Sequence, residues 1–310
     1  MATHIPAFLT DQVIVFGPLT AEYLFTWMAG IPLLANIFYL IALTFCAILL
    51  NYLLMEKELT SRQSHVPAAL FILLNAFISQ SGSFSLVAPA MVFFLFGLGL
   101  YFQIDQSGER NEELFLGNFM VGIAGLLIPP ILIIGALMAV YATVFRGTSF
   151  RIVLLAILAL LMPFYFTWTI FLLNEEGSRF YFDLLDKFHW NLEFSDSRLY
   201  IPSIVSAVFL LIGWISSASS EEWAILKKRT WYRFLVSISF LSVGISFFTL
   251  LTDTVLASAT IGLAGLLYPF LMRRRKWLRN FLFSVFILSA ILHSLEVSGL
   301  IHIPYLSDWL

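Results

Sequence analysis

The sequence predicts an all-α fold, a polytopic membrane helical bundle of about ten crossings that includes short and proline-broken helices. Composition is the first observation: 60% of the 310 residues are hydrophobic and only 12% are charged, whereas a soluble domain carries roughly 25% charged residues. The second is a series of long apolar runs separated by polar loops. The third is the distribution of Lys and Arg, which gather in alternate loops. Together they predict one integral membrane domain over residues 1–310.

The N-terminal segment, residues 1–30, is apolar in patches but is broken by Asp11, Gly17-Pro18 and Glu22. We interpret it as an interfacial or re-entrant segment rather than a crossing. The predicted crossings follow as apolar runs over residues 31–54, 66–80, 84–104, 114–128, 131–145, 152–173, 201–217, 233–252, 254–272 and 280–297. The long hydrophilic stretch 174–200 mixes aromatic and charged residues, which predicts an extracytoplasmic loop with an amphipathic surface helix around 180–190.

The stretch around Pro129 and Pro130 organises the chain, because two apolar runs of similar length flank it. Each run makes a helix of about 22 Å at ~1.5 Å per residue, shorter than the ~30 Å hydrocarbon core. Pro130 would remove a donor and clash inside a continuous helix, and it pushes Pro129 out of the α region. The alternatives are one sharply bent helix or two short helices that meet at a turn, and we favour the second. A turn at membrane depth needs cover from protein or a water-filled cavity, so we expect a cavity or groove here.

The basic residues support two separate crossings on either side of the double proline. If the loop after the first crossing is cytoplasmic and later loops alternate, all but three of the 17 Lys and Arg residues fall in cytoplasmic loops. The exceptions are Arg179, Lys187 and Arg198. One continuous helix over 114–145 would break this alternation. The pattern predicts a multi-pass protein of the bacterial inner membrane with both termini outside the cytoplasm.

The sequence lacks the patterns of several kinds of site. Cys46, within a predicted crossing, is the single cysteine. Because there is only one, intramolecular disulfides and cysteine-based zinc or redox motifs are excluded. The five histidines are scattered, and no GxGxxG, P-loop, GxSxG or HExxH pattern occurs. The net charge of -2 gives no indication of nucleic-acid binding. We therefore expect no metal, no cofactor and no nucleic-acid partner.

Two sets of polar or turn-forming residues are candidates for a site. Asp11 and Glu22 are the only acidic residues before the first crossing, and each is either a catalytic carboxylate at the outer face or an ordinary solvated charge. The expected cavity-lining residues are Asn75, Asn118, Pro129 and Pro130. For the two asparagines, which lie on short predicted helices, the alternative is hydrogen bonding between helices.

The stretch 114–151, LFLGNFMVGIAGLLIPPILIIGALMAVYATVFRGTSFR, places a glycine-containing apolar run, a proline break, a second apolar run and an arginine in succession. Together with FGPLTAEYL (16–24), it resembles part of the GT-C class of glycosyltransferases, polytopic enzymes that use polyprenyl-linked sugars. The resemblance covers residues 14–175 loosely. That class carries an essential acid in the loop after a first transmembrane helix. This chain departs from that pattern, because no crossing is predicted before residue 31, and Asp11 and Glu22 are the only residues that can stand in for the acid.

A second resemblance rests on NYLLMEKELTSRQSHVPAALFILLNAF (51–77) and on the same stretch 114–151. Both are similar to segments of a Bacteroidota family of polytopic inner-membrane proteins. This resemblance implies an inner-membrane location and no particular activity.

The first resemblance implies a GT-C-like scaffold in cell-envelope biogenesis that acts on or beside a lipid-linked glycan. An extracytoplasmic carboxylate, Asp11 or Glu22, would act near a lipid phosphate held by Arg179 or Arg198. The expected partners are membrane lipids, a polyprenyl-phosphate-linked glycan and other membrane protein subunits. Two alternatives remain open: a non-catalytic subunit of a larger membrane assembly, and a small-solute transporter.

Overall fold

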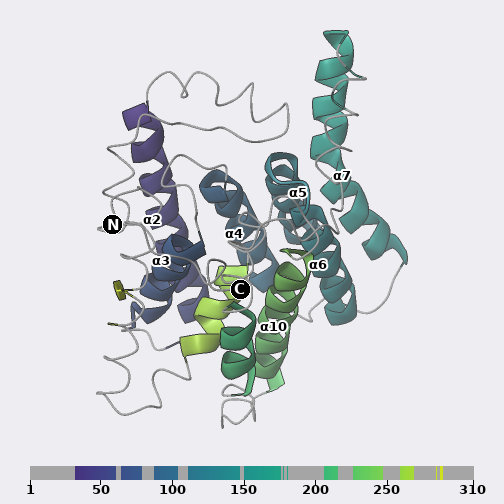
Figure 1. Ribbon diagram of the computed structural model, residues 1–310. Coiled ribbons are helices and arrows are strands. Elements are labelled where there is room, and N and C mark those ends of the chain that lie inside the picture. Colours follow the sequence, from purple (N-terminus) through teal and green to yellow (C-terminus); the bar gives the residue numbers. More distant parts are fainter. Residues whose placement is uncertain are drawn as a thin grey trace, which may run out of the picture.

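The computed structural model (Figure 1) describes residues 32–60, 64–78, 87–103, 111–146, 150–175, 206–215, 226–246 and 259–268, with the single positions 177, 180, 284, 287 and 288. Its labelled helices are α2 (Pro32–Glu56), α3 (Val66–Ile78), α4 (Val87–Gln103), α5 (Asn111–Leu127), α6 (Ile131–Arg146), α7 (Phe150–Leu173) and α10 (Leu226–Ser246). Two shorter apolar helices cover Ser206–Ile215 and Ala259–Tyr268. The described residues contain no strand, which confirms the all-α prediction.

The predicted division at the double proline is present. α5 ends at Leu127 and α6 begins at Ile131, so the alternative of one bent helix is wrong. Two contacts show that these helices run back along each other as a hairpin. A methyl group built on Gly125 would lie 2.6 Å from Leu132 Cδ2, and one built on Gly135 would lie 2.7 Å from Val121 Cγ1.

Glycines on α5 and α4 let these helices approach closely. A methyl group built on Gly97 would lie 2.8 Å from the carbonyl oxygen of Gly117, which is closer than real Cβ atoms come. On another face of α5, a methyl on Gly122 would overlap the carbonyl oxygen of Leu160 in α7. Small residues at helix contacts are typical of membrane bundles, in which van der Waals packing drives association. α5 is therefore the helix around which α4, α6 and α7 pack.

The directions of the helices alternate from α4 to α7. α4 and α5 are antiparallel, because Gly97 contacts Val121 whereas Tyr101, one turn later in α4, bonds to Asn118, which is one turn earlier in α5. α5 and α7 are parallel, because Gly122 contacts Leu160 and Gly125 contacts Phe164. α6, which lies between α5 and α7 in sequence, is antiparallel to α5 and therefore also to α7. The chain thus reverses direction between α4 and α5, between α5 and α6, and between α6 and α7.

Two C-terminal helices also form an antiparallel pair. The Ser239 hydroxyl of α10 donates to the carbonyl of Ala259 (3.4 Å), whereas Leu235, one turn earlier, contacts Gly265. α10 and the helix Ala259–Tyr268 are therefore antiparallel. Leu54, near the C-terminal end of α2, also contacts Gly265. The C-terminal end of α2 therefore lies beside the C-terminal half of the helix Ala259–Tyr268.

Aromatic side chains join three helix ends at one end of the bundle. The rings of Phe102 and Trp231 pack edge to face with centroids 4.5 Å apart, and Phe234 contacts both. Beside them the Tyr232 hydroxyl donates to the carbonyl of Leu59 (3.1 Å). The C-terminal ends of α2 and α4 and the N-terminal end of α10 therefore meet at one place. These are ends that the sequence assigns to cytoplasmic loops.

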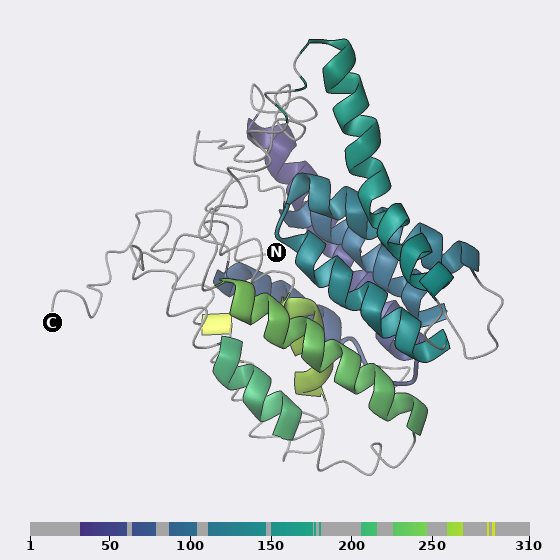
Figure 2. The ribbon, with the colours of Figure 1, turned by 90° about the vertical axis from the view of Figure 1, so that its right-hand side faces the viewer.

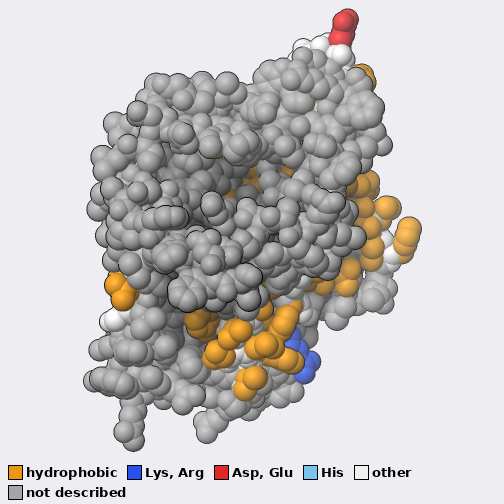
Figure 3. Space-filling model, in the orientation of Figure 1, with side chains coloured by type: hydrophobic (Ala, Val, Ile, Leu, Met, Phe, Trp, Pro, Cys, Tyr) orange, Lys and Arg blue, Asp and Glu red, His pale blue; other side chains and the backbone are white. Residues whose placement is uncertain are grey.

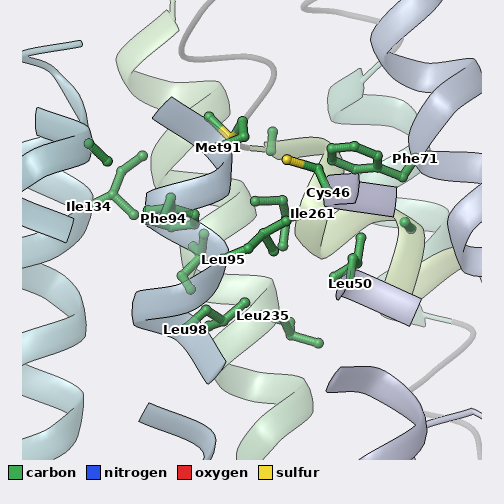
Figure 4. Close-up of a cluster of buried hydrophobic side chains, with 14 of the residues drawn as sticks. Cys46, Leu50, Phe71, Met91, Phe94, Leu95, Leu98, Ile134, Leu235 and Ile261 are labelled. Carbon is green, nitrogen blue, oxygen red and sulfur yellow. The ribbon is translucent and has the colours of Figure 1, made fainter. Parts of the chain in front are cut away.

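The core is apolar and draws on both halves of the chain. Figure 4 shows Cys46 of α2, Phe71 of α3, Met91 of α4 and Leu235 of α10 within one cluster, with Ile261 of the helix Ala259–Tyr268. Cys46 is fully buried, and its thiol lies 3.7 Å from the carbonyl of Ala88. Helices far apart in sequence therefore share one core, as expected for a single domain.

Two helices among the described residues are long and apolar enough to cross a membrane, Ile37–Glu56 and Phe150–Leu173. Both keep large apolar side chains exposed. On α2 these form a stripe at Ile37, Ile41, Phe45, Ile48 and Tyr52. On α7 they cover most of the helix, which lies at the right-hand edge of the molecule where hydrophobic side chains gather in Figure 3. These lengths and faces indicate membrane association.

Candidate functional site

The turn between α5 and α6 is buried, and its backbone donors have partners. Pro129 and Pro130 are both buried and carry no N–H. The N–H of Ile128 donates to the carbonyl of Ala124 (2.9 Å), and that of Ile131 donates to the carbonyl of Ile128 (3.0 Å). The next two donors are satisfied in the same way, by bonds from Leu132 to Pro129 (3.0 Å) and from Ile133 to Pro130 (3.2 Å).

The first turn of a helix normally leaves four N–H groups without a partner inside the helix. Here the three-residue spacing of the bonds satisfies the donors at the start of α6, and the double proline removes two others. Burying an unpaired backbone donor in an apolar medium costs several kcal/mol, about 4–8 by transfer to cyclohexane. The turn therefore meets a requirement of membrane depth, which is that no donor is left for water.

Asn118 lies in α5 and is fully buried. Its Nδ2 donates to the carbonyl of Leu114 (2.8 Å), and its Oδ1 accepts a hydrogen bond from the Tyr101 hydroxyl (2.6 Å). The bond to Tyr101 joins α5 to α4. Sequence reasoning singled out Asn118 but missed Tyr101, because tyrosine at the end of an apolar run is usually assigned to the membrane interface.

Asn75 lies in α3 and is also buried. Its Nδ2 is 2.9 Å from both the carbonyl of Phe71 and the Thr260 hydroxyl, so one amide links α3 to the helix Ala259–Tyr268. Both asparagines therefore form bonds between helices, the alternative noted from the sequence. That these amides and the two prolines also line a cavity stays a prediction.

Replacement of Tyr101 by Phe should lower the stability of the bundle by about 0.5–2 kcal/mol, the range for hydrogen bonds between membrane helices. The reason is that Asn118 Oδ1 would lose a buried partner. Tyr52→Phe is the matched control. The Tyr52 side chain is exposed, so removal of its hydroxyl group should have little effect on stability. Unfolding of the purified variants in detergent measures the difference. Equal stability of Tyr101→Phe and Tyr52→Phe would contradict the assignment.

Two buried polar atoms in the described part of the chain have no hydrogen-bond partner, Asn51 Oδ1 in α2 and Thr60 Oγ1 just after it. Asn51 Nδ2 lies 3.8 Å from Met55 Sδ, a weak contact. Both residues lie toward the end of the bundle that carries the aromatic contacts. Composition alone gave no reason to select Thr60, because it lies in a polar connection.

The other sequence-predicted site residues lie outside the described residues. These are Asp11, Glu22, Arg179 and Arg198, together with residues 181–190 of the expected amphipathic helix. Whether these residues lie near the α5–α6 turn is therefore a prediction that the described residues do not test. Among the residues that are described, no group of three His, Cys, Asp or Glu side chains could hold a metal ion.

Comparisons of the chain with protein-family models, with curated proteins and with solved structures give no match. The class of protein consequently rests on the fold itself. The described residues form an all-α bundle with a shared apolar core, glycine-mediated helix contacts and two apolar helices of membrane length.

Proposed function

We propose that the chain is a multi-pass protein of the bacterial inner membrane, with about ten crossings and both termini outside the cytoplasm. The alternation of helix directions carries this proposal. Successive helices from α4 to α7 reverse, and the ends of α2, α4 and α10 that meet are those flanked by predicted cytoplasmic basic loops. A bundle threaded back and forth across a bilayer has this arrangement.

Within that membrane, the proposed role is a GT-C-like scaffold in cell-envelope biogenesis that acts on or beside a lipid-linked glycan. The resemblance of residues 14–175 to that class supports it. The buried turn of the α5–α6 hairpin is compatible with this role, because non-helical backbone at membrane depth is tolerated where protein or a water-filled cavity covers it. In this proposal Asp11 or Glu22 supplies the carboxylate, and Arg179 or Arg198 holds the lipid phosphate.

A non-catalytic subunit of a larger membrane assembly is the second candidate. The observation that favours it is the use of the buried amides of Asn75 and Asn118 in bonds between helices. Polar groups committed in this way stabilise a scaffold and are not available for a substrate.

Labelling of introduced cysteines tests the proposed topology. Because Cys46 is buried, the background should be small. We expect Ser178→Cys and Ser197→Cys to react with a membrane-impermeant maleimide in intact cells, and Ser219→Cys to react only after the membrane is opened. The reverse pattern would overturn the proposed orientation.

Replacement of the two acidic residues tests the enzymatic role. Loss of a catalytic acid or base should lower activity on the order of a hundredfold or more, whereas loss of a solvated charge usually changes stability by under about 0.5 kcal/mol. Asp11→Asn and Glu22→Gln should be assayed for complementation of a deletion strain and for protein abundance. Loss of function at normal abundance in one variant would support catalysis and contradict the subunit role. Full complementation by both would contradict catalysis through these residues.

A further inference from the structure

Most of the large apolar side chains of α7 are exposed and do not pack inside the bundle. Its inner stripe of Ala156, Ala159, Leu160 and Pro163 is buried against α5 and α6. The exposed side chains on its other faces are Phe150, Leu154, Ile157, Leu158, Leu161, Met162, Tyr165, Phe166, Trp168, Ile170, Leu172 and Leu173. No charged residue interrupts the helix from Ile152 to Leu173. This surface is suited to an apolar environment rather than to water.

The α5–α6 hairpin is much shorter than α7. α5 has 17 residues and α7 has 24, which correspond to about 25 Å and 36 Å at 1.5 Å per residue. The two helices are parallel, and Gly125, close to the turn, lies beside Phe164. From Phe164 to Leu173 the helix rises a further ~14 Å. Figures 1 and 2 both show α7 extending beyond the hairpin at this end.

These lengths fix the depth of the turn relative to α7. Gly125 therefore lies ~14 Å short of the outer end of α7, and Pro129, four residues further along, lies about 8 Å short of it. If α7, about 36 Å long, crosses a hydrocarbon core of ~30 Å, the turn is still within the hydrocarbon. The hydrogen bonds of the turn agree with that depth, because its N–H groups are satisfied or absent. A turn exposed to water would not need this arrangement.

We propose that the α5–α6 hairpin turns inside the outer half of the bilayer, and that phospholipid acyl chains cover the exposed face of α7 beside and above the turn. This inference rests on the proposed membrane location and adds the depth of the turn and the occupant of the α7 surface. Three observations select acyl chains as that occupant: the unbroken apolar length, the match of that length to a bilayer, and charges only at its ends. Those end charges are on Arg151 and Glu175, both exposed.

Nitroxide labels on α7 provide the test. Single cysteines replace Leu161, Tyr165 and Leu173 in a Cys46→Ala background, and Ala156→Cys is the buried control. The labelled protein is reconstituted into vesicles of phosphatidylethanolamine and phosphatidylglycerol. Collision rates are then measured with oxygen, which concentrates in hydrocarbon, and with a water-soluble nickel chelate. Because Phe164 lies beside Gly125, one helical turn before the double proline, the label at Tyr165 reports the depth of the hairpin just before its turn.

We expect oxygen collisions at Leu161 and Tyr165 to exceed nickel collisions several-fold, and the ratio to fall at Leu173 near the interface. Nickel access at Tyr165 equal to that at Leu173 would place the turn at the membrane surface and overturn the proposal. Low collision rates with both reagents at Leu161 and Tyr165, as at Ala156, would show that a protein surface covers α7. Failure of the reconstituted protein to float with vesicles after an alkaline wash would instead contradict the membrane location itself.

Discussion

Gly122→Ala should destabilise the bundle by about 1–3 kcal/mol or more, the cost of inserting a group into a packed contact. The added methyl group would overlap the carbonyl oxygen of Leu160, and it would lie 3.0 Å from Pro163 Cγ. A flexible side chain could rotate away, but a backbone carbonyl within α7 moves only with the helix. α5 and α7 would therefore have to separate along their shared face.

Gly244→Ala is the matched control for this prediction. Gly244 lies inside α10, is exposed, and has no atom within 4 Å of a methyl group built on it. Alanine in a helix interior is about 0.5–1 kcal/mol more favourable than glycine, so this variant should be as stable as the wild type or slightly more stable. Thermal unfolding of both variants in the same detergent measures the difference. A Gly122→Ala variant that matches Gly244→Ala would show that the α5–α7 contact is looser than the structure indicates.

The division of 114–145 into two helices was predictable because proline acts locally. Pro129 and Pro130 restrict the backbone whatever surrounds them, so their effect could be inferred without knowing the fold. The predicted run 152–173 likewise matches α7 within two residues, because apolar length alone defines it. Pro163 lies inside α7, where the Thr167 hydroxyl donates to its carbonyl (2.9 Å) and the helix continues.

The contacts between helices could not be predicted in the same way. Gly122 differs from Gly244 only in what lies opposite, and the sequence does not say which helices are neighbours. The parallel packing of α5 on α7 is an example. It depends on α6, the intervening helix, running antiparallel to both. The bond from Tyr101 to Asn118 is another, because it crosses a connection whose geometry the sequence does not define.

The candidate site was predictable only in part for a related reason. The sequence indicates Asn118 as a cavity-lining residue because it lies on a short predicted helix, with hydrogen bonding between helices as the alternative. A buried amide needs a partner, and in the structure that partner is Tyr101. Whether that partner would be a substrate, water or another helix depended on the tertiary structure. The acidic and basic candidates, by contrast, were chosen from their position along the chain and lie outside the described residues.

Replacement of both Pro129 and Pro130 by Ala should sharply reduce the amount of folded protein. The two new N–H groups would lie one helical turn after the carbonyls of Gly125 and Leu126, which could accept them as in a continuous helix. A single helix over residues 111–146 would then compete with the hairpin. It would remove the contacts of Gly135 with Val121 and Leu160. It would also invert every crossing that follows, in conflict with the basic loops.

The yield of folded protein and the labelling of Ser178→Cys together test this prediction, because an inverted chain would place Ser178 in the cytoplasm. Pro163→Ala is the control. Pro163 lies within a helix that is already continuous, so its replacement restores one N–H to α7 and should leave both the yield and the labelling pattern near those of the wild type. If the double-alanine variant also gives normal yield and unchanged labelling, then the contacts of α6 with α5 and α7 hold the hairpin, and the prolines serve only to remove unpaired donors from its turn.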